Sequence, residues 1–202
     1  MLMAVNPDHP EPRKIARAAA ALEAGDVIAY PTDTVYGLGC DPLNKKAIDR
    51  LYAIKGMDRS HPLAFICPDL SDIARYAIVE KFHYRILRRL LPGPYCFILS
   101  STREVPKMLQ SKRRTVGIRI PAHAVTIALT RALGRPLVST TAQRESDEHP
   151  YVDPREIDIA FPGLGLIIDA GAGGEVPSTV VDLTTNPPTI VREGAGPVAA
   201  IS

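Results

Sequence analysis

Cysteine is scarce in this chain, which has three among its 202 residues. Cys40, Cys67 and Cys96 are odd in number and far apart, so they match neither a zinc-binding spacing nor a disulfide framework. Because structural disulfides belong to oxidising compartments, this cysteine usage predicts a protein of the reducing cytoplasm.

Signals for several other protein classes are also missing. No run of about 18 apolar residues occurs, so no membrane span is expected, and the first residues lack the basic and apolar regions of a secretory signal. Tryptophan is absent and aromatic residues make up 5% of the chain, which weakens any base-stacking platform. The net charge of +2 is too small to indicate nucleic-acid binding by itself.

Common catalytic and phosphate-binding motifs are missing too. The glycine-rich residues 171–174 lack the pattern of a Walker loop, so a flexible turn is the simpler interpretation. No Ser–His–Asp order, HExxH motif or paired cysteine motif occurs, and no metal site is predicted. The chemistry would then rest on positioning and charge stabilisation, as in phosphoryl and nucleotidyl transfer.

The composition that remains is that of an ordinary globular protein. Apolar residues make up 46% and charged residues 23% of the chain, and the length predicts a single domain over residues 1–202. Apolar residues at helical spacing predict helices over residues 11–24, 44–55, 71–76, 79–91 and 122–133.

Short apolar runs between these helices predict strands. They cover residues 26–30, 63–67, 95–99, 115–120, 137–140, 164–169, 178–183 and 189–192. Strands and helices alternate early in the chain, whereas neighbouring strands dominate late. This order predicts an α/β fold, with an open twisted mixed sheet of parallel and antiparallel strands and flanking helices.

Polar side chains follow the first predicted strand directly. The apolar run at residues 27–30 ends at Pro31, and Thr32, Asp33 and Thr34 come next. Open α/β sheets bind ligands at the ends of strands. Hydroxyl groups here, with cations supplied from elsewhere, would suit a small zwitterion and a phosphate chain.

Lys55, Arg59 and His61 are candidates to supply that positive charge. Two interpretations remain open for each residue. Lys55 and Arg59 suit either a bound ligand or the solvated end of a helix, where positive charge complements the macrodipole. His61 is either an ordinary loop residue or a ligand contact.

Residues 115–120 alternate between apolar and polar side chains, as in a strand with one buried face. Val116, Ile118 and Ile120 are expected to face the core, which places Thr115, Gly117 and Arg119 on the opposite face. An arginine on this face indicates either an anion-binding surface or a solvent-exposed face of the sheet.

A second basic group lies on the helix predicted at residues 79–91. Lys81, Arg85, Arg88 and Arg89 share this segment, and residues 112–114 add further positive charge. Such a face is either solvated or able to follow an RNA backbone.

Six stretches occur in the order found in the YrdC/YciO family. They are residues 30–39 (YPTDTVYGLG), 54–63 (IKGMDRSHPL), 115–121 (TVGIRIP), 139–141 (STT), 177–182 (PSTVVD) and 191–194 (VREG). The chain resembles this family over residues 12–195, and it is most similar to the YciO branch.

The resemblance implies a YrdC/RibB-like sheet with a large concave basic cavity, and L-threonylcarbamoyladenylate synthase activity. Threonine, bicarbonate or CO₂, and ATP carrying Mg²⁺ would give threonylcarbamoyl-AMP and pyrophosphate. A downstream threonylcarbamoyl transferase would then modify the adenine beside the anticodon of certain tRNAs.

The same resemblance assigns roles to individual residues. Contacts to threonine or its carbamate would come from Thr32, His61, Arg119, Ser139 and Ser178, with Thr34 a near alternative to Thr32. Contacts to ATP would come from Lys55, Arg59, Thr115, Thr141 and Arg192. Catalysis would rest on Lys55, Arg59 and Arg119, which offset charge on the reacting groups.

The chain departs from the family pattern at two positions. Met57 replaces an arginine, which removes one phosphate ligand unless Arg59 takes its place, and Thr141 replaces an asparagine, so one hydroxyl stands in for an amide. Two other functions stay open: a double-stranded RNA or tRNA-binding module without ATP chemistry, and a carbamoyl-adenylate enzyme for another amine.

Overall fold

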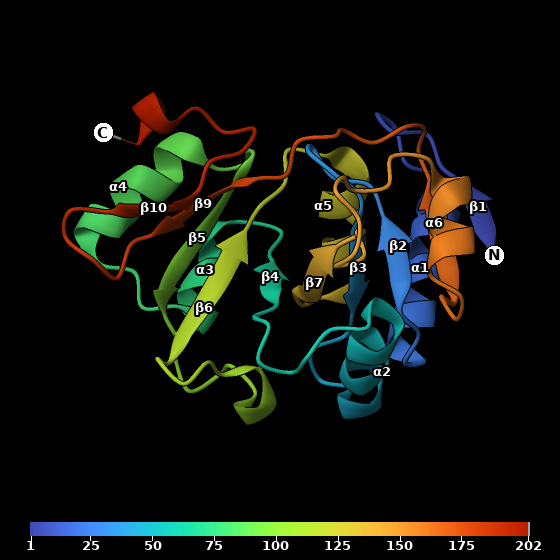
Figure 1. The fold of residues 1–202 in the computed structure, drawn as a ribbon, viewed down its shortest axis with the longest axis horizontal. Helices are drawn as coiled ribbons and strands as arrows, with labels where there is room; N and C mark the ends of the chain where they lie inside the picture. Colours follow the sequence, from blue (N-terminus) through green and yellow to red (C-terminus); the bar gives the residue numbers. More distant parts are fainter. Residues whose placement is uncertain (202) are drawn as a thin grey trace.

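One ten-stranded sheet organises residues 1–201, which are the residues that the computed structural model describes (Figure 1). Its strands are β1 (Leu2–Ala4), β2 (Ile28–Tyr30), β3 (Gly37–Cys40), β4 (Ala64–Ile66), β5 (Tyr95–Ser100), β6 (Thr115–Arg119), β7 (Leu137–Thr141), β8 (Leu166–Asp169), β9 (Thr179–Asp182) and β10 (Thr189–Arg192). The helices are α1 (Pro12–Glu23), α2 (Lys45–Lys55), α3 (Leu70–Tyr76), α4 (Lys81–Leu90), α5 (Ala124–Leu133) and α6 (Pro154–Ala160), with short 3₁₀ turns at Lys107–Leu109 and Val198–Ala200.

The strands follow the order β1-β8-β2-β3-β7-β4-β6-β5-β9-β10. The pairs β1–β8, β2–β8, β4–β6 and β5–β9 are parallel, whereas β2–β3, β3–β7, β4–β7, β5–β6 and β9–β10 are antiparallel. The predicted α/β fold with a mixed open sheet is therefore confirmed.

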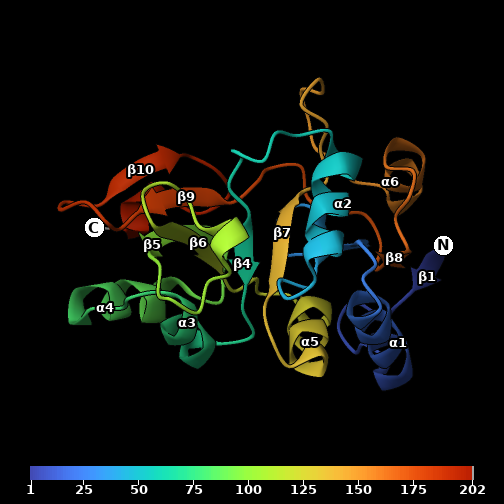
Figure 2. The ribbon, with the colours of Figure 1, turned by 90° about the horizontal axis from the view of Figure 1, so that it is seen from below.

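The helices cover the two faces of this sheet unequally. In Figure 2, α1, α3, α4 and α5 lie along one side, whereas α2 and α6 lie on the other side and only toward the N-terminal end. Among the described residues, no α-helix packs on the part of this second face over β4, β5, β6 and β9. The cavity described below lies there.

Local sequence explains where α2 begins and ends. The Asn44 side chain accepts a hydrogen bond of 3.1 Å from the backbone amide of Ala47, which caps the helix. Gly56 ends it with a φ of 70°, a left-handed conformation that favours glycine. Ile48 and Leu51 are fully buried, so the apolar face of α2 fixes the direction in which Lys55 leaves the helix.

Two strands and one α-helix were not predicted from the sequence: β1, β3 and α6. β3 reads Gly-Leu-Gly-Cys and lacks the expected alternation of apolar and polar residues. Its glycines make room for the buried ring of Tyr30, because a Cβ on Gly37 would lie 2.8 Å from Tyr30 Cζ. Tertiary contact, rather than strand propensity, therefore selects this sequence.

Two apolar side chains on the helices are exposed rather than packed in the core. Phe82 on α4 is 47% exposed, because Ile86 and Leu87 form the buried face of that helix. Ala132 on α5 is also exposed, and Leu133 takes its place in the core. All three cysteines are free.

Candidate functional site

A cavity of about 780 Å³ opens on the uncovered part of the sheet. Its floor is formed by Cys96 and Ile98 of β5, Gly117 of β6 and Val180 of β9. The segment over residues 108–113 and the segment over residues 59–63 form its walls. The predicted strand face is confirmed, since Thr115, Gly117 and Arg119 line the cavity together.

Most of the residues proposed from the sequence meet in this cavity. Those that line it are Thr32, Arg59, His61, Thr115, Arg119, Ser139, Thr141, Ser178 and Arg192. They come from segments far apart in the chain, which the sheet order brings together.

Thr34 and Lys55 are the two proposed residues that do not line the cavity. Thr34 is 4% exposed and lies behind the cavity wall in contact with Arg119. Lys55 Nζ donates a hydrogen bond of 2.9 Å to the Thr141 carbonyl oxygen and faces a smaller neighbouring pocket, together with Glu145 and Ser146. Burial lowers the pKa of Lys55 from 10.5 to about 8.

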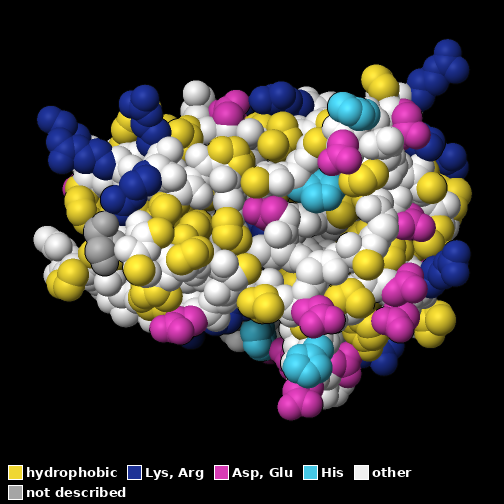
Figure 3. Space-filling view, turned by 90° about the horizontal axis from the view of Figure 1, so that it is seen from above, with side chains coloured by type: hydrophobic (Ala, Val, Ile, Leu, Met, Phe, Trp, Pro, Cys, Tyr) yellow, Lys and Arg dark blue, Asp and Glu magenta, His cyan; other side chains and the backbone are white. Residues whose placement is uncertain are grey.

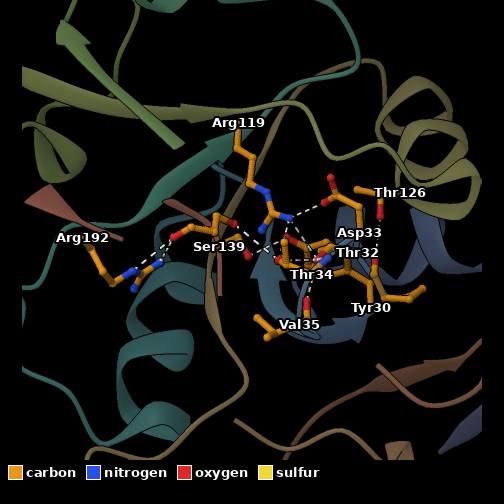
Figure 4. Close-up of polar contacts among 11 residues, drawn as sticks. Tyr30, Thr32, Asp33, Thr34, Val35, Arg119, Thr126, Ser139 and Arg192 are labelled. Atoms are coloured by element: carbon orange, nitrogen blue, oxygen red, sulfur yellow. Dashed lines mark hydrogen bonds and ion pairs between the residues drawn. The ribbon is translucent and has the colours of Figure 1, made fainter. Parts of the chain in front are cut away.

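Arg119 is the centre of the buried end of the cavity (Figure 4). Its Nη2 forms an ion pair with Asp33 and also donates to Thr34 Oγ1 at 2.8 Å and to Thr32 Oγ1 at 3.2 Å. The residue is 8% exposed, and its buried Nε has no hydrogen-bond partner among the described residues. Arg119 is thus held firmly and still has a donor to offer.

Thr32 is held as firmly as Arg119. Its hydroxyl donates to the Val35 carbonyl oxygen at 2.6 Å and accepts from the Thr34 amide at 3.1 Å as well as from Arg119. One donor and two acceptor positions are all that a hydroxyl has. The Thr32 hydroxyl is therefore saturated, and its role in this state is to fix Arg119.

Tyr30 and Asp33 are site residues to which the sequence assigned no role. Tyr30 donates to Ser139 Oγ at 2.5 Å, and burial raises its pKa to about 12. Tyr30 lies in the apolar run at residues 27–30, so the sequence indicated only a position in the core. Asp33 could have been identified as a site residue from the sequence, because it lies between Thr32 and Thr34 directly after that strand.

The cavity carries one sign of charge. Among the described residues that line it, none is Asp or Glu, whereas its cations are Arg59, Lys112, Arg113, Arg119 and Arg192. Arg192 donates to the Ser178 carbonyl oxygen at 2.8 Å, and burial together with the charge of Arg119 lowers the pKa of Arg192. Such a lining favours an anionic ligand.

Two of the side chains that line the cavity are paired with carboxylates, and further cations lie away from it. His61 pairs with Glu145 at 3.2 Å, and Arg59 pairs with Asp49 at 2.5 Å while its side chain is 62% exposed. Arg85 and Arg88 are exposed on α4. In Figure 3, lysine and arginine side chains lie toward both ends of the face shown, including the end where α4 lies, and fewer of them lie near its centre.

The glycine-rich residues 171–174 do not form an open phosphate loop. The amide of Gly171 donates to Asp169 Oδ1 at 3.0 Å, that of Gly173 to the Val152 carbonyl at 2.8 Å, and that of Gly174 to the Thr34 carbonyl at 2.7 Å. These amides are already used, so side chains must bind any phosphate group here.

Neither a metal centre nor a membrane helix is found in the described part of the chain. No group of three or more His, Cys, Asp or Glu side chains over residues 1–201 lies where it could hold a metal ion. Over the same residues, the helices are too short or too polar to cross a bilayer. A metal ion in the cavity would need ligands from a bound molecule, because the lining supplies no carboxylate.

A family model described as "Telomere recombination", covering Sua5, YciO and YrdC proteins, matches residues 20–194. The chain belongs to the Sua5/YciO/YrdC family. Within this family, "Uncharacterized protein YciO" of Escherichia coli (strain K12) is 40% identical over 196 residues, which are 96% of this chain and 95% of the relative. Its crystal structure matches this fold with a TM-score of 0.95 over 100% of this chain and 99% of that one, at 38% identity.

Two other members of the Sua5/YciO/YrdC family have informative names. A "Threonylcarbamoyl-AMP synthase" of Chromobacterium violaceum is 37% identical over 179 residues, which are 88% of this chain and 92% of the relative. The crystal structure of P. abyssi Sua5 complexed with L-threonine matches with a TM-score of 0.92 and 30% identity, over 100% of this chain and 59% of that chain. The resemblance drawn from the sequence, to the family and to YciO, is confirmed.

Proposed function

We propose that this chain makes threonylcarbamoyl-AMP from threonine, bicarbonate or CO₂, and ATP, and releases pyrophosphate. The proposal rests on one observation above all. A buried arginine, Arg119, meets hydroxyl groups at one end of a cavity whose lining cations include Arg192 at β10. A small amino acid fits the first end, and a phosphate chain fits the cationic lining.

The proposed reaction has two steps that balance without a protein nucleophile. The neutral amine of threonine attacks CO₂, which gives a carbamate and releases a proton. A carbamate oxygen then attacks the α-phosphorus of ATP as the bond to the β-phosphate oxygen breaks, and pyrophosphate leaves with that electron pair. Arg119 holds the threonine carboxylate, while Arg192 and Thr115 hold phosphate oxygens.

Lys55 and Arg59 enter this scheme with smaller roles than the family resemblance implies. Lys55 lines a separate pocket, and Arg59 is occupied by Asp49. Any Mg²⁺ would arrive with the nucleotide, and we assign it no step, because the lining has no carboxylate to hold it. The product would serve a separate transferase that modifies tRNA.

The test is direct detection of the product. Purified protein is incubated with threonine, ATP and ¹³C-bicarbonate, and threonylcarbamoyl-AMP carrying the label is measured by mass spectrometry. We expect labelled product from the wild type and from Arg88→Ala, a variant on the exposed face of α4. A panel of other amino acids identifies a different amine if threonine gives nothing. Absence of any adenylate with every amine contradicts the proposal.

The exposed basic face of α4 favours a second function, binding of double-stranded RNA or tRNA without ATP chemistry. Arg85 and Arg88 are exposed there, and Lys81 lies one helical turn from Arg85. Affinity for RNA that falls steeply with salt and is lost in Arg85→Ser/Arg88→Ser, with no adenylate formed, supports this function. Adenylate formation together with unchanged RNA affinity in that variant argues against it.

A further inference from the structure

In the described part of the chain, four carboxylates lie outside the cavity and pair with side chains that line it. These pairs are Arg59–Asp49, His61–Glu145, Arg113–Asp182 and Arg119–Asp33. The Glu145 side chain is 55% exposed, which is more than any of the other three carboxylates. Glu145 is therefore the carboxylate that can leave its partner with the least rearrangement.

Glu145 lies in the loop between β7 and α6, which projects on the side of the sheet that carries α2 (Figure 2). Its neighbours in the loop are anchored away from the cavity. Arg144 Nε donates to the Ala160 carbonyl oxygen at 3.1 Å, and Asp147 accepts from the Tyr151 hydroxyl at 2.6 Å. These anchors leave Glu145 as the acidic residue of the loop that reaches across to the cavity wall.

Two basic side chains lie beside the Glu145 carboxylate. On the main cavity, His61 Nε2 lies 3.2 Å from Glu145 Oε1. In the smaller pocket, Glu145 and Lys55 are lining residues together. Burial lowers the pKa of Lys55, and the charges of Glu145 and Asp147 act in the opposite direction. Glu145 thus places one negative charge at the boundary between the two pockets.

A negative charge at this boundary opposes the ligand that the cavity favours. The lining is cationic and has no carboxylate among the described residues, so it attracts anions such as a phosphate chain. A phosphate group near His61 would be repelled by Glu145 and would find His61 already in contact with a carboxylate. Phosphate and carboxylate therefore compete for the same side chain.

We propose that Glu145 competes with the phosphate chain of the nucleotide, and that a bound triphosphate displaces Glu145 from His61. This inference rests on the proposed function, which supplies the nucleotide, and it adds a residue that sets the affinity for it. The same competition weakens the binding of pyrophosphate. Glu145 would therefore favour the departure of this product after the adenylate has formed.

Glu145→Gln tests the competition, because it keeps the size of the side chain and removes its charge. Binding of ATP, inorganic triphosphate and adenosine is measured by isothermal titration calorimetry in the absence of threonine. We expect ATP and triphosphate to bind about three- to fivefold more tightly than to the wild type, the range of a partly exposed charge pair. Adenosine has no charge, and its affinity should not change.

The matched control is Glu148→Gln, which makes the same change of charge at an exposed position three residues further along the loop. It should leave the affinity for triphosphate unchanged. If both variants bind triphosphate more tightly by the same factor, the net charge of the loop is responsible, and the inference is overturned. Thermal unfolding of each variant checks that the fold is intact.

Hydrogen exchange at the backbone amides of residues 144–146 tests the displacement itself. Adding triphosphate to the wild type should speed this exchange, because the loop then loses its contact with His61. In Glu145→Gln the exchange should be fast already and should change little. Slower exchange on adding triphosphate to the wild type would mean that the loop closes onto the ligand, which contradicts the inference.

The remaining outcomes separate this inference from the proposed function. If Glu145→Gln binds triphosphate no more tightly than the wild type while labelled adenylate is formed, the inference fails and the proposed function stands. If the gain in triphosphate affinity is found but no adenylate forms with any amine, Glu145 competes with a different phosphate ligand and the proposed function fails. If the wild type binds neither ATP nor triphosphate, both fail.

Discussion

Two ion pairs between arginine and aspartate show how the scaffold and the cavity differ. Arg135, in the turn between α5 and β7, binds Asp41 through two parallel hydrogen bonds, Nε to Oδ1 at 2.9 Å and Nη2 to Oδ2 at 2.6 Å. Its Nη1 donates to the Leu133 carbonyl at 3.1 Å, and Asp41 also accepts from the Leu43 amide at 2.9 Å. Every polar group of this pair has a partner.

The pair in the cavity is satisfied much less completely. Arg119 contacts Asp33 through Nη2 alone, and both Arg119 Nε and Asp33 Oδ2 are buried without a hydrogen-bond partner among the described residues. Buried polar groups without partners cost free energy, so a chain selected for stability alone would pair them. The difference indicates that the scaffold pair serves folding, whereas the cavity pair keeps binding capacity for a ligand.

Arg119→Ala gives the largest expected effect. The change removes the proposed carboxylate donor and leaves Asp33 with no ion-pair partner, so threonine-dependent pyrophosphate release should fall by about 1,000-fold. Arg119→Lys keeps the positive charge but lacks the planar guanidinium group that can bind a carboxylate through two hydrogen bonds. Pyrophosphate release by this variant should therefore fall nearly as far. Activity is measured by a coupled pyrophosphate assay.

The control for Arg119→Ala is Arg88→Ala, which removes an exposed arginine of α4 and should keep full activity. Equal activity in the two variants would mean that the substrate binds elsewhere. The Arg119–Asp33 pair would then have no binding role that separates it from the Arg135–Asp41 pair.

Arg135→Ala should show the reverse behaviour. It leaves Asp41, which is 4% exposed, without its charge partner, and loss of one member of a buried pair costs about 3 kcal/mol. The midpoint of thermal unfolding should fall by roughly 6–12 °C for a chain of this size. Threonine affinity below the new midpoint should not change.

Lys14→Ala is the matched control for that experiment. It breaks an ion pair with Glu11 in which both side chains are more than a third exposed, and it should leave the midpoint in place. A loss of threonine affinity in Arg135→Ala would mean that the scaffold pair also shapes the cavity.

The sequence could predict the cations and hydroxyls of the cavity more readily than the contacts that orient them. Thr115 and Arg119 were visible because they share one face of an alternating strand. The role of Tyr30 was not visible, because it depends on β3 pairing with both β2 and β7, and Tyr30 and Ser139 are 109 residues apart in the chain.

The fold shows the same limit. Periodic helices such as α1 and α2 were predicted within a residue or two. Strand β3 was missed because its glycines are required by the close approach of the Tyr30 ring and not by strand propensity. Lys55 was expected in the site from its place in a motif. Its long side chain ends instead on the Thr141 carbonyl, a contact that depends on how α2 packs beside β7.

Arg192→Ala and Arg59→Ala extend the comparison to the cations proposed for ATP. Arg192 contacts a carbonyl oxygen rather than a carboxylate and lies near Arg119, so a phosphate should be its best partner. Its loss should raise the KM for ATP by about tenfold with little change for threonine. Arg59 already pairs with Asp49, and its loss should raise that KM by about twofold or less.

Salt offers an independent check on these two cations. Raising the ionic strength should weaken ATP binding more than threonine binding, because Arg119 is buried and exposed cations such as Arg59 are screened. A larger KM effect from Arg59 than from Arg192 would show that Arg59 leaves Asp49 to bind the nucleotide.

Lys55→Met should change the free energy of unfolding less than Arg135→Ala does. The sign of this change follows from the pKa of Lys55. The pKa of Lys55 falls from 10.5 to about 8 because burial disfavours the charged amine. Between these two pH values the unfolded chain holds a proton that the folded chain has released, so stability rises with pH in this window. Below pH 8 the folded protein bears the full cost of a charged, half-buried amine.

Replacing Lys55 by Met should therefore stabilise the protein at pH 7, by about 1 kcal/mol after allowance for partial exposure. The gain should shrink between pH 8 and pH 10.5 and vanish above that range. Urea unfolding across this pH range measures it, and Lys46→Met, at an exposed position on the same helix, is the control. If the gain is absent at pH 7, a carboxylate such as Glu145 or Asp147 neutralises Lys55 in solution, and Lys55 then belongs with Arg135 among the satisfied cations of the scaffold.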